Sequence, residues 1–175
     1  MNPGKSAIER MRQYLSKQQY VGKNKPENII YEQEMNKMHL HVVIKDCDKF
    51  SFLLEGIQFK FTDESQDLHL NWDSLKKYAD NLIKKVTYLL EDLSIVEEDP
   101  VNSKLLIRSA ASETEIPTPC YYEIIMTGNG TISLNRFKIL KEQKQRVEVP
   151  FNLTNEVLEK LINDVAGCMQ KLNFE

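Results

Sequence analysis

One short stretch of the sequence, KMHLHVVIKDC at residues 37–47, holds the side chains best suited to chemistry. His39 and His41 are two residues apart, so a β-strand would project both imidazoles from the same face. Imidazole is a common metal ligand, and a catalytic zinc site needs three protein ligands and an open position for water. His69 and Asp67 are the candidates for the third ligand. This spacing raises the hypothesis of a metal-dependent enzyme.

The residues around the histidines favour an ordinary strand surface instead. The positions that alternate with them are apolar and form the better core face: Leu40, Val42 and Ile44. His39 and His41 then lie on the outer face beside Lys45, and the turn at 46–49 takes Cys47 away from them. No HExxH or HxHxDH motif occurs in the sequence. We therefore expect no metal at the three histidines, and no cofactor.

Other catalytic signatures are absent from the sequence as well. It has no GxSxG nucleophile motif, no GxxxxGK phosphate loop and no GxGxxG dinucleotide motif. The GNG at residues 128–130 lies between two strand-like runs and predicts a hairpin turn. The acids at 97–99 stand beside Pro100 and are typical of a solvated turn. The sequence therefore favours a non-enzymatic protein.

Composition predicts one folded domain in a reducing compartment. The 175 residues are 41 % hydrophobic and 28 % charged, which suffices for a single core. The three cysteines contain no CxxC pair and predict no disulfide framework. The N-terminus has no apolar signal segment, and no apolar run approaches the ~20 residues of a membrane span. We expect a soluble, cytoplasmic protein without a membrane contact.

Charge is distributed unevenly along the chain. Residues 1–26 carry six basic side chains and one acidic side chain, whereas the whole chain has a net charge of −3. A basic N-terminal helical arm and linker therefore precedes an acidic body at 27–175, which we predict to be a single α+β domain. Such an arm either meets an acidic partner, nucleic acid included, or docks on its own acidic domain.

The arm contains a predicted helix at residues 6–19. Ser6 and Glu9 have the spacing of a capping box at its start. Its apolar stripe is narrow and would bury little area, so the helix needs a partner surface. The predicted partner-binding residues are Ile8, Met11, Leu15, Arg10, Arg12 and Lys17.

The body opens with a predicted hairpin whose second strand changes parity. Its apolar residues stand at even positions up to Leu54 and at odd positions from Ile57 onward. One face can hold both sets only if an extra residue is inserted, so a β-bulge at Glu55-Gly56 is one interpretation. The other interpretation makes Glu55-Gly56 the tip of a second hairpin.

The remaining periodicities complete an α-ββ-α-ββββ(β)-α order. A long amphipathic helix begins at an Asp73 cap and runs to residue 93, and a final helix begins after Thr154. Strand patterns cover 93–99, 104–110, 120–127, 131–140 and, more briefly, 146–151. We predict an α+β fold with a single mixed or mostly antiparallel sheet of about six strands, covered on one face by two long amphipathic helices.

A second basic cluster offers a nucleic-acid hypothesis. Sheets that carry aromatic and basic side chains often bind single-stranded RNA. The candidate residues are Arg136, Lys138, Lys141, Lys144, Arg146 and Tyr121. No RNP1-like motif is present and the body is acidic, so a solvated hairpin is the favoured interpretation.

These observations predict a small adaptor-like or chaperone-like interaction or regulatory protein that binds a protein partner or itself as a homodimer. The strand edge at Arg146–Phe151 is a candidate for pairing with another chain. The element order is loosely similar to that of small bacterial secretion chaperones, a fold-level analogy that transfers no residues. A nucleic-acid-binding accessory protein is the second hypothesis, and a metal-dependent enzyme is the third.

Overall fold

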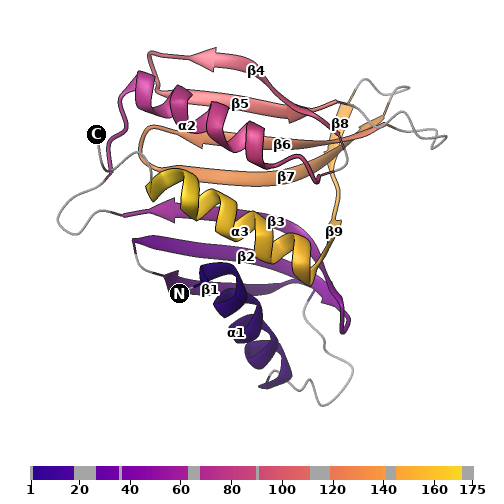
Figure 1. Cartoon of the computed structure of the whole chain (residues 1–175). Coiled ribbons are helices and arrows are strands. Elements are labelled where there is room, and N and C mark those ends of the chain that lie inside the picture. Colours follow the sequence, from indigo (N-terminus) through magenta and orange to yellow (C-terminus); the bar gives the residue numbers. More distant parts are fainter. Residues whose placement is uncertain are drawn as a thin grey trace.

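The nine strands of the described chain belong to one open antiparallel sheet, and three helices lie against one of its faces (Figure 1). The computed structural model describes residues 2–17, 27–35, 37–62, 68–89, 91–110, 119–140 and 145–170. The helices are α1 (Pro3–Lys17), α2 (Trp72–Lys85) and α3 (Asn155–Gln170). The strands are β1 (Ile29–Met35), β2 (Met38–Cys47), β3 (Ser51–Phe61), β4 (Leu93–Asp99), β5 (Lys104–Ser109), β6 (Cys120–Thr127), β7 (Thr131–Leu140), β8 (Gln145–Glu148) and β9 (Phe151–Thr154).

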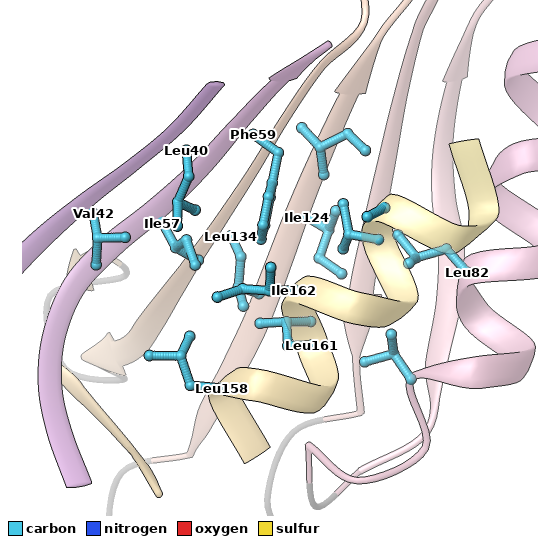
Figure 2. Close-up of a cluster of buried hydrophobic side chains, with 14 of the residues drawn as sticks. Leu40, Val42, Ile57, Phe59, Leu82, Ile124, Leu134, Leu158, Leu161 and Ile162 are labelled. Atoms are coloured by element: carbon cyan, nitrogen blue, oxygen red, sulfur yellow. The ribbon is translucent and has the colours of Figure 1, made fainter. Parts of the chain in front are cut away.

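The sheet has the strand order β1-β2-β3-β7-β6-β5-β4. On the helical face α3 lies between α1 and α2 and contacts both (Figure 1). Side chains alternate along each strand, and the inward set is apolar and buried. Figure 2 shows this core between the strands and helices α2 and α3, with these labelled members: Leu40, Val42, Ile57, Phe59, Leu82, Ile124, Leu134, Leu158, Leu161 and Ile162. No described helix is long and apolar enough to cross a membrane.

The α+β class and the single antiparallel sheet are confirmed, but the sheet has nine strands instead of about six, and α1 covers it together with the two predicted helices. β1 was not predicted, because acidic residues interrupt its apolar pattern and its inward Gln33 is polar. The Tyr31 hydroxyl donates to Gln33 Oε1 at 2.7 Å, which satisfies this amide oxygen inside the protein. A predicted strand at 146–151 is divided into β8 and β9 by Pro150.

Helix α1 is the third helix on the sheet and shares its core. Ala7 and Met11 are fully buried, and Ile8 is 9 % exposed. The close approach of α1 to α3 occurs at Gly4, whose N–H donates to Asn163 Oδ1 at 2.8 Å. A Cβ at Gly4 would lie 2.2 Å from the Glu159 carbonyl oxygen. Glycine is therefore required where the two helices cross.

The helix boundaries differ from the predicted ones at three of the ends. Helix α1 begins at Pro3, and Asn2 Oδ1 accepts from the Lys5 N–H at 2.9 Å, so the predicted Ser6 cap is wrong. Helix α2 is capped by Asn71 instead of Asp73 and ends at Lys85. Its apolar pattern continues past that residue because the following turn still buries side chains in the core. The Thr154 cap of α3 is confirmed by its bond from the Val157 N–H.

Strands β3 and β7 pair over four residues each and then diverge. β3 pairs with β7 through Ile57–Lys60 and with β9 through Ser51–Leu54. β7 pairs with β8 through 137–140, beyond its contact with β3. We call this divergence the fork. The chain enters the fork as β8, bends at residues 149–150 and leaves it as β9.

The predicted bulge lies in β3, at the point where β3 and β7 begin to diverge. Gly56 pairs with Val43 and Leu54 pairs with Ile44, so Glu55 is the inserted residue of β3. The alternative of a hairpin tip is wrong, because β3 is one continuous strand. Gly56 needs no positive φ. Its role is steric, since a Cβ there would lie 2.9 Å from Asn135 Nδ2 of β7.

The two helical glycines at the α3 surface give a matched test of this packing. Gly4→Ala places a methyl group against the Glu159 carbonyl, so we expect a loss of about 2 kcal/mol in the free energy of unfolding. Gly167→Ala meets only Lys85 Nζ at 3.5 Å and should stabilise the protein by up to about 1 kcal/mol. Urea denaturation of both variants measures the difference. Equal effects would contradict the close crossing of α1 and α3.

Candidate functional site

The second face of the sheet carries no helix within the described residues, and we call it the open face. It consists of the outward residues of the strands, which alternate with the buried ones. One line of cross-strand neighbours runs across it: Glu97, Leu106, Ile125, Ser133, Gln58, His41 and Glu32. Most of these side chains are partly exposed, and apolar and polar types are mixed.

The histidines lie on this open face, as the strand pattern predicted. His41 Nδ1 is 3.0 Å from Glu32 Oε1 on the neighbouring strand. His39 stands between Glu34 and Lys60 in the register. His69 is exposed in the segment that precedes α2. Within the described residues no group of three His, Cys, Asp or Glu side chains is placed to hold a metal ion.

The other proposed ligands lie apart from these histidines. Asp67 is outside the described residues. Cys47 is exposed at the end of β2. The absence of a metal stays a prediction from the sequence.

A buried carboxylate is the most constrained group on the open face. Glu123 of β6 is 3 % exposed, and its Oε2 accepts from Arg108 Nε at 2.9 Å and from Arg146 Nη1 at 2.6 Å. One arginine comes from the neighbouring strand β5 and the other from β8, which pairs with β7, so the carboxylate links β5, β6 and β8. Charge-assisted hydrogen bonds of this kind are needed to keep an ionised carboxylate out of water.

Two stacked aromatic rings support these arginines. The rings of Tyr121 and Phe137 are stacked with centroids 5.9 Å apart. Arg108 lies 5.3 Å from the Tyr121 ring and Arg146 lies 4.6 Å from the Phe137 ring. Hydrogen bonds with Tyr121 and Glu123, together with the carboxylate charge, raise the pKa of Arg146, so this guanidinium stays charged. We call these five residues, Glu123 included, the Glu123 cluster.

Sequence reasoning named Tyr121 and Arg146 for a nucleic-acid role but did not identify Arg108 and Glu123 as their neighbours. An acid within the apolar run YYEII was a usable signal, because a charged residue inside a buried strand requires a partner. Its two arginines could not be paired with it without the strand order, since they are 15 and 23 residues distant.

The structure separates the residues of the nucleic-acid hypothesis. Tyr121 and Arg146 lie on the open face. Arg136 and Lys138 of β7 lie on the opposite, helical side of the sheet. There Arg136 is 5.2 Å from the Tyr122 ring. Lys141 and Lys144 are outside the described residues. The described members therefore form no single basic surface.

The partner-binding residues predicted on α1 contact the rest of this chain. Ile8 and Met11 are in the core, and Leu15 packs against it. Arg12 lies 4.1 Å from the Phe52 ring and donates to the backbone carbonyl oxygens of Asp48 and Ser51. The two remaining members, Arg10 and Lys17, are exposed. A role of these six residues in binding a partner stays a prediction.

The described surface also has a small hollow beside the open face. It is lined by Glu97, Asp99, Lys104 and Leu106 and measures about 30 Å³. Sites for small molecules usually measure about 300 Å³ or more, so this hollow accepts roughly one water molecule. Its polar lining is typical of a solvated sheet edge.

Comparison of the chain with protein-family models, with curated proteins and with solved structures finds no match.

The Glu123 cluster is testable through stability. Glu123→Gln leaves two guanidinium groups facing a neutral amide, so we expect the free energy of unfolding to fall by about 2–3 kcal/mol. Glu98→Gln removes the exposed pair with Lys76 and should change it by about 0.5 kcal/mol or less. Urea denaturation of both variants checks this. A similar small loss for both would mean that Glu123 is solvated.

Proposed function

We propose that this chain is a non-enzymatic interaction protein whose open face binds a protein partner. One observation carries the proposal: the described helices cover one face of a nine-stranded sheet and leave the other uncovered. A sheet of this width with one bare face offers a broad, nearly continuous surface. Surfaces of that kind fit proteins better than small molecules, which need concave sites.

Several polar groups of the open face are paired with one another. Lys45 Nζ is 2.8 Å from Glu55 Oε1, and Asn135 donates to Glu148. The Glu123 carboxylate is satisfied by its two arginines. A partner that covers this face therefore leaves these groups hydrogen-bonded, which limits the penalty of removing water from them. Leu106 and Ile125, opposite each other in the register, supply an apolar centre.

The same geometry makes nucleic acid the weaker candidate. Bases bind to proteins by stacking on open aromatic faces. Tyr121 is 7 % exposed, and its ring is stacked on Phe137 and approached by Arg108. Acidic side chains such as Glu32 and Glu97 also lie on the open face together with its basic side chains. The cytoplasmic location predicted from the sequence remains part of the proposal.

Two lysine substitutions, one on the open face and one away from it, test the proposal. The tagged chain and its variants are purified from cells at low salt and measured by native mass spectrometry. We expect a stoichiometric polypeptide on the wild-type chain that is lost in Ile125→Lys, because the new charge lies in the apolar centre of the face. Val101→Lys, at the 92 % exposed turn after β4, should retain it.

Thermal unfolding of both variants confirms that they are folded. A polypeptide retained by Ile125→Lys would place the binding surface elsewhere. A wild-type chain that carries nucleic acid in place of a polypeptide would favour the second hypothesis.

A further inference from the structure

The backbone hydrogen bonds of β8 can be assigned to its two sides. The Val149 N–H donates to the Arg136 carbonyl at 2.9 Å, in the same register as the β7–β8 ladder. Antiparallel ladders alternate between hydrogen-bonded and non-hydrogen-bonded pairs. Val147, two residues before Val149, therefore directs its N–H and C=O toward β7. Arg146 and Glu148 direct theirs to the opposite side.

An independent bond agrees with this assignment. The Ile139 N–H donates to the Pro119 carbonyl at 3.0 Å, toward β6. Ile139 is the residue of β7 opposite Arg146. It therefore belongs to a pair that exchanges no hydrogen bonds across β7 and β8, as the alternation requires.

The outer side of β8 is an accessible strand edge. All four residues of the strand are exposed, Val147 at 43 % and the Arg146 side chain at 50 %. Within the described residues no backbone group bonds to the N–H or C=O of Arg146 or Glu148 on this side. An edge of this kind pairs with a further strand when the side chains permit it.

Arg146 and Glu148, whose backbone groups face away from β7, restrict how two copies of β8 can pair. We call them the outward residues of β8. Three two-fold antiparallel registers bring outward residues opposite one another, centred on Arg146, on Val147 or on Glu148. The first register opposes two arginines and the third opposes two glutamates, and like charges in directly opposite positions are destabilising. The register centred on Val147 opposes Arg146 of each copy with Glu148 of the other. It is the self-complementary arrangement.

We propose that two copies of this chain associate through antiparallel pairing of β8 in the register centred on Val147. Each copy then donates the N–H groups of Arg146 and Glu148 to the other, and both Val147 side chains meet at the two-fold axis. Arg146 uses Nη1 on Glu123 and keeps further N–H groups for the new carboxylate. This inference goes beyond the proposed function, since the second copy pairs with the edge of β8 and does not cover the open face.

The other described edges of the sheet are less suited to a second copy. β1 projects Glu32 and Glu34, so two copies of this strand bring four acids together. β4 has a register shift between Ile95 and Glu97 and ends in three acids. Irregular and like-charged edges resist pairing. Because β8 has only four residues, we expect a dimer that forms in a concentration-dependent manner.

Cysteine cross-linking tests both the surface and the register. In a background with Cys47→Ser and Cys120→Ser, Val147→Cys places two thiols at a non-hydrogen-bonded pair, where the Cα atoms are about 4.5 Å apart. This separation permits a disulfide. Val96→Cys is the matched control, since Val96 is also a valine on an edge strand and is 50 % exposed. We expect mild oxidation to cross-link Val147→Cys at least tenfold faster than Val96→Cys.

A charge variant completes the test. Glu148→Lys places a lysine opposite Arg146 of the second copy, so Glu148→Lys in the Val147→Cys background should remove the rapid cross-link. Glu97→Lys makes the same charge change on β4 and should leave it intact. Sedimentation of the chain without added cysteines, over a concentration series, should show a dimer that Glu148→Lys abolishes.

Equal cross-linking rates for Val147→Cys and Val96→Cys, or a wild-type chain that stays monomeric throughout the series, would overturn the β8 dimer. Neither result would affect the proposed function, because that is judged by the loss of a partner from Ile125→Lys. Failure of both experiments would remove the interaction proposal as a whole.

Discussion

The divergence of β3 and β7 is the constraint on which the rest of the fold depends. Both strands pair normally until Gly56 meets Asn135, and the inserted Glu55 then bends β3 away. The exposed sides of the two strands need new partners, because unpaired backbone groups within a sheet are unfavourable. One segment supplies both partners by pairing first with β7 and then with β3. Pro150 stands at its bend, where it lacks an N–H that a ladder would use.

Side-chain contacts on both faces of the sheet hold the diverging strands together. On the helical side Phe151 of β9 packs edge-on against Tyr122 of β6, at a centroid distance of 5.5 Å across the fork. On the open side the Glu123 carboxylate joins β8 to the sheet through Arg146. Helix α1 adds a third contact, because Arg12 donates to the backbone of the β2–β3 turn. The N-terminal helix and the open face are thus parts of one structure.

The sequence was sufficient for features that depend on local periodicity and insufficient for those that depend on strand order. The alternation around His39 correctly placed the histidines on the outer face, and the parity change at Leu54 and Ile57 correctly located the bulge. The stripe on α1 was correctly predicted to need a covering surface, but that surface is α3, where Asn163 contacts Gly4 from 159 residues away. Glu123 and its arginines likewise meet only because β5, β6, β7 and β8 are neighbours.

The distribution of charge along the edges explains why β8 is the part of the sheet suited to self-association. Long, regular edges promote uncontrolled sheet growth, and proteins protect them with charge and bulges. β1 and β4 have such protection. β8 carries one base and one acid at its outward positions, so a second copy satisfies both at once and leaves no third copy an equivalent edge. β8 ends at Glu148, just before the bend at Pro150, which limits the pairing further. A short self-complementary edge therefore favours a closed pair over a fibre.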